Sequence, residues 1–339
     1  MRLHEGSAGA RVLAFGGYQP ARIVTNDELA ATVETSDEWI RSRVGIASRK
    51  IAGPDETVAD MAVAAAGKAL AGSGLSPGDI DLVIVATCTP EVMIPNTAAV
   101  VARRLGISAP GAYDLNAACA GFCYALAAAS DAVRAGSARY VLVIGAEKLS
   151  QWVDWTDRST CIIFADGAGA AVVGPAGPET EEPAAQEQAA QEQAAQEADP
   201  GIGPVVWGSD GDMADKIYIQ DRNSFIVQEG QAVFRWATTA LHPVARKACA
   251  EAGVDPTELA VFVPHQANLR IIESLARRIG APQAKVASDI VTAGNTSSAS
   301  IPLALSRMIE RGELASGDKA LLIGFGAGVC YAAQVITLP

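Results

Sequence analysis

The sequence contains little of what a metal centre, a disulfide scaffold or a nucleic-acid binder requires. Its 339 residues include three histidines, and its six cysteines form no CxxC pair and no compact framework. Acidic residues outnumber basic ones by 38 to 26, whereas proteins that bind a phosphate backbone neutralise it with clustered Lys and Arg. We therefore expect no metal site, reduced thiols and no nucleic-acid partner.

Long apolar segments are also missing. Residues 1–20 hold no uninterrupted apolar stretch of the signal-peptide kind. The longest weakly polar run, residues 320–333, is rich in glycine and falls short of the roughly 20 residues that span a bilayer. We expect no membrane partner and a cytoplasmic location.

Half of the residues are hydrophobic, so the chain can bury a large core. Short apolar runs rich in β-branched residues alternate with Ala-rich stretches of helical length. The runs cover residues 82–87, 140–144, 170–173, 260–263 and 320–323, and two of the Ala-rich stretches cover residues 58–71 and 121–135. This alternation predicts an α/β fold whose strands are covered on both faces.

Two parts of the chain repeat four elements in the same order. The first series is a strand at 82–87, the segment Ala102-Arg-Arg-Leu-Gly106, a helix after Cys119 and a strand at 140–145. The second is a strand at 260–263, the segment Ala276-Arg-Arg-Ile-Gly280, a helix after Asn295 and a strand at 320–324. This order indicates an internal duplication, with an N-terminal half at 1–174 and a C-terminal half at 205–339.

Residues 175–204, between the two halves, differ from both in composition. The tract repeats Ala-Ala-Gln-Glu and carries seven acidic residues and no basic one. Low hydrophobicity without an apolar period predicts an acidic low-complexity insertion on the surface, disordered or loosely helical. A role in docking a partner remains open.

Cys119 is the first candidate for chemistry. It ends the segment Asp114-Leu-Asn-Ala-Ala-Cys119, where a strand-like piece meets an Ala-rich helix. The dipole and free N–H groups of a helix start stabilise a thiolate, so this position favours a nucleophile. A purely structural cysteine is the alternative, and it is the interpretation that we favour for Cys123, one helical turn later.

Two further polar residues stand where strands and turns lead into helices. His265 follows the apolar run 260–263, and in α/β sheets the carboxyl ends of strands are where ligands bind. Asn295 lies in a turn before a helix, where Asn ordinarily serves as a cap. Structural roles remain open for both residues on this pattern alone.

Together these segments resemble β-ketoacyl-acyl-carrier-protein synthase III. The resemblance rests on Ala-Cys119-Ala-Gly-Phe, on Pro264-His-Gln-Ala-Asn-Leu-Arg270 and on Gly294-Asn-Thr-Ser297. It extends to the segments Thr35-Ser-Asp-Glu-Trp-Ile-Arg-Ser-Arg43, Thr156-Asp-Arg-Ser159, Phe164-Ala-Asp-Gly-Ala-Gly169 and Phe325-Gly-Ala-Gly328. It implies the thiolase fold, a duplicated five-layered α/β/α/β/α body, and a homodimer.

The resemblance also implies a reaction. Cys119 takes an acyl group from acyl-CoA, and malonyl-acyl-carrier protein then loses CO₂ and attacks the cysteinyl thioester to initiate a fatty-acid or polyketide chain. His265 and Asn295 are implied to donate hydrogen bonds to the enolate oxygen. The backbone N–H groups of Cys119 and Ala327 are implied to form the oxyanion hole, with Ala327 where family members usually have glycine. Acyl-CoA is a substrate, and no cofactor is expected.

Further positions match the family's binding surfaces. The residues implied to bind CoA are Thr35, Trp39, Arg43 and Arg158. The basic patch implied for the acidic carrier protein consists of Arg235, Arg270, Arg277 and Arg278. Ile94, beside Met93, matches a residue that the partner subunit inserts into the acyl pocket. Because a bulky aromatic there shortens the pocket, Ile94 predicts tolerance for longer or branched primers.

Four alternatives differ from this interpretation in class or chemistry. A non-decarboxylating CoA-dependent acyltransferase of the same fold has less need of the enolate donors His265 and Asn295. A plant-type polyketide synthase shares Cys, His and Asn but uses malonyl-CoA, and the carrier-protein patch disfavours it. A cysteine hydrolase needs a water-activating base, and a non-catalytic scaffold could dispense with Cys119.

Overall fold

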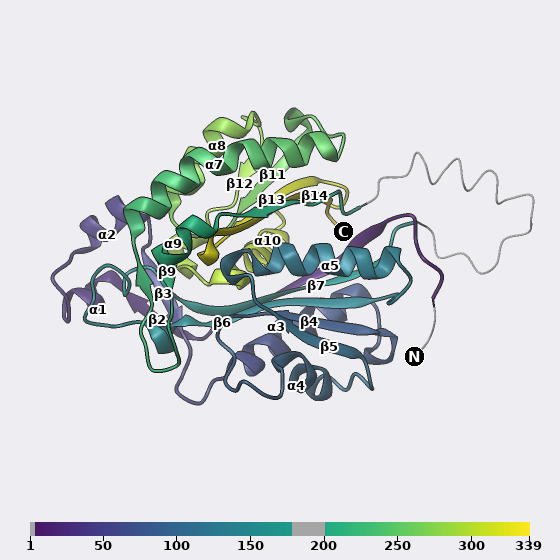
Figure 1. The fold of residues 1–339 in the computed structure, drawn as a ribbon, viewed down its shortest axis with the longest axis horizontal. Coiled ribbons are helices and arrows are strands. Elements are labelled where there is room, and N and C mark those ends of the chain that lie inside the picture. Colours follow the sequence, from purple (N-terminus) through teal and green to yellow (C-terminus); the bar gives the residue numbers. More distant parts are fainter. Residues whose placement is uncertain (1–3, 178–200) are drawn as a thin grey trace, which may run out of the picture.

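Two five-stranded sheets with the same strand order organise the chain (Figure 1). The computed structural model describes residues 4–177 and 201–339. The first sheet has the order β1-β7-β6-β4-β5, with β1 at Ala10–Tyr18, β4 at Leu82–Ala86, β5 at Gly111–Leu115, β6 at Val141–Lys148 and β7 at Asp166–Pro175. The second, given in the corresponding direction, has the order β8-β14-β13-β11-β12. Its strands are β8 at Val206–Ser209, β11 at Leu259–Pro264, β12 at Lys285–Val286, β13 at Lys319–Phe325 and β14 at Cys330–Thr337.

Both sheets are mixed in the same way. In the first, β5, β4 and β6 are parallel to one another. Strand β7 pairs with β6 in the antiparallel direction, and β1 pairs with β7 in the antiparallel direction. In the second, β12, β11 and β13 are parallel to one another. Strand β14 pairs with β13 in the antiparallel direction, and β8 pairs with β14 in the antiparallel direction. The predicted duplication is therefore confirmed in the strand order and direction of the two sheets. The edge strands β1 and β8 were not predicted.

Nine helices complete the description of residues 4–177 and 201–339. They are α1 at Asn26–Ala30, α2 at Asp37–Val44, α3 at Val58–Ser73, α4 at Thr97–Arg104, α5 at Gly121–Arg134, α7 at Gly230–Glu251, α8 at Leu269–Ile279, α9 at Ile290–Ala293 and α10 at Ser300–Glu310. Two small ribbons pair β2 (Arg22–Thr25) with β3 (Ser48–Ile51) and β9 (Ile217–Tyr218) with β10 (Val227–Gln228). None of the helices in these ranges is long and apolar enough to cross a membrane.

The helices and sheets form five layers (Figure 1). Helices α5 and α10 pack with both sheets in one buried cluster and so form the central layer. Helices α3 and α4 cover the outer face of the first sheet, and α7 and α8 cover the outer face of the second. The predicted thiolase architecture, with strands covered on both faces, is confirmed.

The sequence explains why α5 lies inside. Nine of its 14 residues are buried, and three of the nine are Ala, with Phe122 and Leu126 as the largest. A helix that is apolar on all sides belongs in a core, and small side chains let a sheet approach it from each side. Strands β4 and β6 are buried on both faces for the same reason, which is why they appear as continuous apolar runs.

The duplication extends to the backbone before the two central helices. A short 3₁₀ turn precedes each helix, at Ala118–Ala120 before α5 and at Ser297–Ala299 before α10. The first residue of each turn has a positive φ, 46° at Ala118 and 52° at Ser297, a conformation that residues other than glycine seldom adopt. Both strained turns lie at the active-site end of the central layer.

The proposed division of the chain at residues 174 and 205 remains a prediction. The first sheet ends with β7 at Pro175, and the second begins with β8 at Val206. Most of the acidic insertion lies outside the described residues, which resume at Gly201. The predictions made for the insertion therefore stay as they are.

Candidate active site

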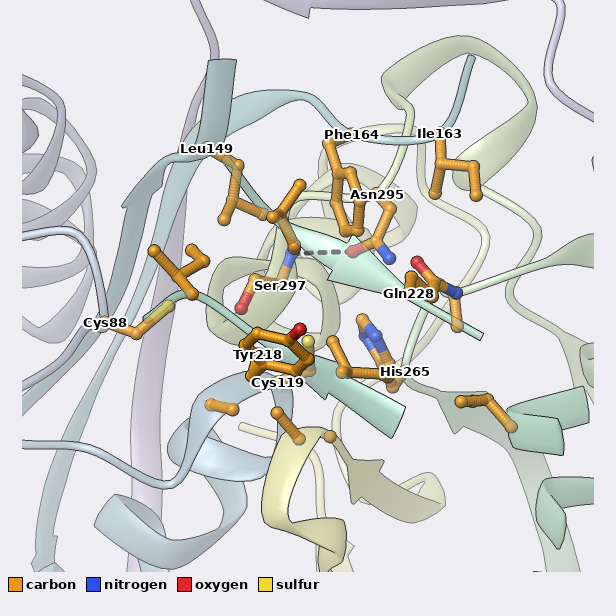
Figure 2. Close-up of a pocket in the computed structure, with 18 of the residues that line it drawn as sticks. Cys88, Cys119, Leu149, Ile163, Phe164, Tyr218, Gln228, His265, Asn295 and Ser297 are labelled. Atoms are coloured by element: carbon orange, nitrogen blue, oxygen red, sulfur yellow. Dashed lines mark hydrogen bonds between the residues drawn. The ribbon is translucent and has the colours of Figure 1, made fainter. Parts of the chain in front are cut away.

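A cavity of about 1520 Å³ lies where the two halves meet, and Cys119, His265 and Asn295 all line it (Figure 2). Cys119 follows β5 and His265 follows β11, so both stand beyond the carboxyl ends of parallel strands. Asn295 precedes the strained turn that leads into α10. The fold thus brings together three residues that the sequence separates by up to 176 positions, from 119 to 295.

Cys119 lies in the turn Ala118–Ala120 and is pressed against the C-terminal loop of the second half. A Cβ atom on Gly326 would lie 2.5 Å from the backbone nitrogen of Cys119, so only glycine fits at that position. Gly121 is similarly close to β4, because a Cβ there would lie 3.0 Å from that of Ala86. These close approaches fix the backbone of the candidate nucleophile from two sides.

The thiol of Cys119 is protonated in this ligand-free site. Burial raises its pKa to about 12, a hydrogen bond with Ser297 opposes that rise, and the charge of Glu147 adds to it. The favourable field of a helix start, which made Cys119 a candidate nucleophile, stays a prediction.

His265 is neutral and held in place by its neighbours. Burial lowers its pKa to about 3, and its Nδ1 lies 2.7 Å from the hydroxyl of Ser300. The same hydroxyl accepts a hydrogen bond from the backbone N–H of Gln266. The ring of Phe325 packs against the imidazole at 5.1 Å in an edge arrangement. A neutral, oriented imidazole can donate or accept a hydrogen bond without changing charge.

Asn295 is held by its backbone and by the oxygen of its own side chain. Its N–H donates to the carbonyl of Ile163, and its carbonyl accepts from the N–H of Ala165. Its Oδ1 accepts a 2.8 Å hydrogen bond from the backbone N–H of Ser297, the dashed line in Figure 2. Because the oxygen is used in this way, the amide nitrogen is the part of Asn295 that remains to donate.

A buried carboxylate lies behind these residues, and sequence analysis missed it. Glu147 is the last but one residue of β6 and is fully buried. It accepts hydrogen bonds from the hydroxyls of Thr89, Ser297 and Ser298 at 2.6, 3.1 and 3.0 Å, and from the backbone N–H of Cys88. Burial raises the pKa of this carboxyl. The available signal was an acidic residue near the end of an apolar strand, which is the kind of position that made His265 a candidate.

Gln266 and Ser300 were also missed, and both position His265. The side chain of Gln266 is buried, and its amide donates to the carbonyls of Pro264 and Ala287. Its Oε1 accepts from the N–H of Ile290.

Within residues 4–177 and 201–339, no group of three or more His, Cys, Asp and Glu side chains could hold a metal ion.

Comparisons with known proteins agree with this geometry. Models of 3-oxoacyl-[acyl-carrier-protein] synthase III match residues 113–191, and models of its C-terminal part match residues 249–338. A relative from Streptomyces coelicolor, β-ketoacyl-[acyl-carrier-protein] synthase III 4, is 56% identical over 99% of this chain and 100% of its own length. The chain belongs to the β-ketoacyl-acyl-carrier-protein synthase III family.

Solved structures of the ketosynthase III family share the fold. The priming β-ketosynthase of the R1128 polyketide pathway is 43% identical, with a TM-score of 0.89 over 100% of this chain and 98% of its own. The enzyme from Aquifex aeolicus VF5 is 39% identical, with a TM-score of 0.87 over 97% of this chain and 100% of its own. The coverage includes both halves of the ketosynthase.

The backbone of this ketosynthase accommodates Ala327 at a position where glycine is usual in the family. Among the glycine-rich loop residues, Gly328 has a φ of 106°, whereas Ala327 is not a positive-φ residue. An alanine side chain therefore causes no backbone strain there. The neighbouring Gly326 is the position at which a side chain would collide with Cys119.

Three of the residues predicted to bind CoA belong to an arm of the ketosynthase, residues 22–51, that includes α1 and α2. The fourth, Arg158, comes from another segment and donates to the carbonyl of Glu34 in the arm. The guanidinium of Arg158 lies 4.7 Å from the ring centre of Trp39, and that of Arg43 lies 5.6 Å from it. Thr35 belongs to the same arm, and its Oγ1 is buried without a partner among the described residues.

A buried arginine attaches this arm to the body. Arg49 in β3 is completely buried, and its guanidinium donates to Asn26 Oδ1 and to the carbonyls of Val24 and Ile162. Burial lowers its pKa to about 10. Because Ile162 belongs to a segment that lines the cavity, Arg49 connects the arm directly to the site.

The predicted carrier-protein patch is divided by the structure. Arg235 on α7 and Arg270 on α8 line the cavity of the ketosynthase and are exposed. The guanidinium of Arg270 lies 5.1 Å from the ring centre of Phe234. Arg277 and Arg278 stand in the last turn of α8 and do not line the cavity, and Arg278 donates to the carbonyl of Thr238.

The two residues predicted for the acyl pocket are the most exposed large apolar side chains among those described. Met93 is 82% exposed and lines the cavity, whereas Ile94 is 88% exposed and does not. Ile94 therefore does not contribute to the pocket of its own subunit. Cys88, half-buried and bonded through its backbone to Glu147, lines the cavity and was missed as a pocket residue.

Proposed function

We propose that this protein condenses an acyl-CoA primer with malonyl-acyl-carrier protein to give a 3-ketoacyl-acyl-carrier protein, through an acyl group carried on Cys119. One observation carries the proposal: a cysteine, a neutral histidine and an asparagine with a free amide nitrogen line the same cavity. Membership of the β-ketoacyl-acyl-carrier-protein synthase III family supports it. The product initiates a fatty-acid or polyketide chain.

In the first half-reaction, the sulfur of Cys119 attacks the thioester carbonyl of acyl-CoA. The backbone N–H groups of Cys119 and Ala327 receive the oxyanion, because the close approach of Gly326 brings their segments together. The carbon–sulfur bond to CoA then breaks, and the CoA thiolate takes up the proton released by Cys119. The pKa of about 12 for the free thiol means that substrate binding accompanies its activation.

In the second half-reaction, the malonyl thioester loses CO₂ and leaves an enolate. The amide nitrogen of Asn295 and the imidazole of His265 donate hydrogen bonds to its oxygen. Such donation requires a proton on Nε2 of His265, which follows when the hydroxyl of Ser300 donates to Nδ1. The enolate carbon attacks the cysteinyl thioester, a carbon–carbon bond forms, and the Cys119 thiolate leaves and is reprotonated from water.

The remaining features of the proposal concern binding. Trp39, Arg158, Thr35 and Arg43 bind the nucleotide end of acyl-CoA, and the arginines at the cavity mouth receive the acidic carrier protein. The enzyme acts as a cytoplasmic homodimer without a cofactor. The exposure of Ile94, which lies outside its own cavity, supports an interface in which it enters the partner's acyl pocket.

A two-step labelling experiment tests the proposal. The protein is incubated with radiolabelled acyl-CoA, and we expect label on Cys119 and release of CoA. Addition of malonyl-carrier protein should then release CO₂ and move the label into a ketoacyl product. Hydrolysis of the label without condensation would contradict the proposal, as would labelling of a Cys119→Ala variant.

The alternative is a non-decarboxylating CoA-dependent acyltransferase of the same fold. It is not favoured, because simple transfer has less need of two hydrogen-bond donors for an enolate. The named relatives are ketosynthases. Transfer of label to an acceptor without release of CO₂ in the same experiment would distinguish it.

A further inference from the structure

Gln228 places an unsatisfied hydrogen-bond acceptor in the cavity. It ends β10 and lines the cavity that holds Cys119. Its Oε1 is buried and has no hydrogen-bond partner among the described residues. Figure 2 shows its amide in the same part of the cavity as the side chains of His265 and Asn295.

The backbone around Gln228 is fixed, so its place in the cavity is not accidental. It pairs with Ile217 of β9, and the flanking N–H groups of Ile226 and Glu229 donate to the carbonyls of Trp152 and Lys216. Trp152 itself lines the cavity. The ribbon therefore holds the Gln228 side chain against the cavity.

An orphaned acceptor at this position is costly unless a ligand satisfies it. Leaving a buried acceptor unpaired costs about 1–3 kcal/mol, and such groups are rare in folded proteins. The side chains of His265 and Asn295 line the same cavity and could donate, but the proposed mechanism directs their N–H groups at the thioester oxygen. A donor from the ligand is therefore the natural partner of Gln228.

The chemistry of the two substrates identifies that donor. Acyl chains, thioester oxygens and malonyl carboxylates offer no N–H or O–H group to an acceptor. Acyl-CoA and acyl-carrier protein, however, share a pantetheine arm in which two methylene groups separate the thioester sulfur from an amide N–H. That N–H lies about 4 Å from the sulfur, so it comes close to His265 and Asn295 whenever the thioester reaches Cys119.

We propose that Oε1 of Gln228 accepts a hydrogen bond from the pantetheine amide N–H next to the thioester sulfur. This inference rests on the proposed function and adds to it a residue that positions both substrates. Because both half-reactions bring the same arm through the cavity, one side chain serves acyl loading and condensation alike. Gln228 holds the thioester in register with Cys119 and takes no part in bond making.

Two synthetic thioesters that differ in one group test the proposal. An acyl S-(2-acetamidoethyl) thioester contains the amide N–H, and the matching S-(2-acetoxyethyl) thioester has an ester oxygen in its place. We expect the unaltered protein to label Cys119 about tenfold faster with the amide compound, the ratio that a hydrogen bond of about 1.4 kcal/mol produces. In Gln228→Met, which keeps the length and removes the acceptor, that ratio should fall to about one.

A matched control separates this effect from general damage to the cavity. Gln231 also lines the cavity but is exposed, so Gln231→Met should keep the tenfold preference. An equal ratio in the unaltered protein and in Gln228→Met overturns the inference, as does a ratio of one in the unaltered protein. Equal slowing of both compounds in Gln228→Met also overturns it, since it points to a general effect on the cavity instead.

The outcomes also distinguish the inference from the proposed function. Absence of label on Cys119 from acyl-CoA and from both synthetic thioesters contradicts the function. Normal labelling with an unchanged ratio contradicts only the role of Gln228. If Gln228→Met does not fold, Gln228→Glu keeps an acceptor of similar size and should retain a preference for the amide compound, and loss of that preference overturns the inference.

Discussion

The hydroxyl of Ser297 donates a 3.1 Å hydrogen bond to the buried carboxylate of Glu147, and its backbone N–H donates a 2.8 Å hydrogen bond to Oδ1 of Asn295. A residue of the second half thereby links Asn295 to a carboxylate near the end of β6 in the first half. The strained φ of Ser297, 52°, is maintained by this contact and by the bond from its N–H to Asn295. One residue thus sets the geometry of two others.

Replacing this carboxylate should affect both stability and chemistry. In Glu147→Gln an NH₂ group faces hydroxyl and N–H donors, so we expect the free energy of unfolding to fall by about 1–3 kcal/mol. Displacement of Ser297 should also slow acyl labelling of Cys119 by about tenfold. Denaturant unfolding and single-turnover labelling measure the two effects.

A matched control for that variant is Asp81→Asn. Asp81 accepts hydrogen bonds from the backbone N–H groups of Arg139 and Tyr140, at the opposite end of the first sheet. It should lower stability without slowing the labelling. If Glu147→Gln labels at the normal rate, the carboxylate supports only the fold.

The pH dependence of stability should show the burial of His265. Its pKa is about 3 in the folded protein and about 6.5 in the unfolded chain, so the unfolded chain binds an extra proton between these values. The free energy of unfolding should fall as the pH decreases from 6.5 towards 3, by up to about 1.4 kcal/mol per pH unit from this group. His265→Gln should remove that contribution. The difference between the two denaturation profiles isolates it, and parallel profiles would disprove the shift.

Alkylation of Cys119 should report its protonation directly. Because burial raises the pKa of the thiol to about 12, the thiolate fraction rises about tenfold per pH unit through pH 7 to 10. The iodoacetamide reaction of the Cys119 peptide, followed by mass spectrometry, should therefore accelerate over this range without a plateau. A plateau near pH 7 would mean that the helix start dominates after all.

Charge reversal at the cavity mouth should separate the two half-reactions. Arg270→Glu should reduce turnover with malonyl-carrier protein about tenfold or more at low salt, while acyl-CoA loading changes little. Arg246→Glu, on an exposed position of α7 outside the patch, is the control. Equal losses in both half-reactions would falsify the assignment of Arg270 to carrier-protein binding.

Enlarging Ile94 should change the choice of primer. If Ile94 enters the partner's pocket, Ile94→Phe should lower the labelling rate with long or branched acyl-CoA, relative to acetyl-CoA, by about tenfold. Stability of the subunit should not change, because the side chain is 88% exposed. Val286→Phe, at an exposed position on the edge strand β12, should leave the preference unaltered.

Sequence reasoning succeeded where the physical constraint is local. Strands buried on both faces, such as β4 and β6, must be continuous apolar runs, and helix α5 must be rich in small residues because sheets lie on both sides of it. The edge strand β1 was missed because its inner and outer residues differ and its apolar run is interrupted. The motifs around Cys119, His265 and Asn295 led to the three residues that line the cavity.

The rest depends on contacts that no local pattern contains. Glu147 meets Ser297 across 150 positions of sequence, and Gln228 faces the cavity only because a two-residue ribbon turns it inward. The helix start at Cys119 is visible in the sequence, whereas the burial that raises the pKa of its thiol is not. Ile94 shows its exposure only once the fold is known.

The paired turns before the two central helices hold different side chains at equivalent positions. Cys119 is the second residue of the first turn, and Ser298 is the second residue of the other. The hydroxyl of Ser298 donates to Glu147 and to the carbonyl of Ala86. Equivalent positions of the two halves therefore have different tasks, since one holds the candidate nucleophile and the other holds a hydroxyl that supports the buried carboxylate.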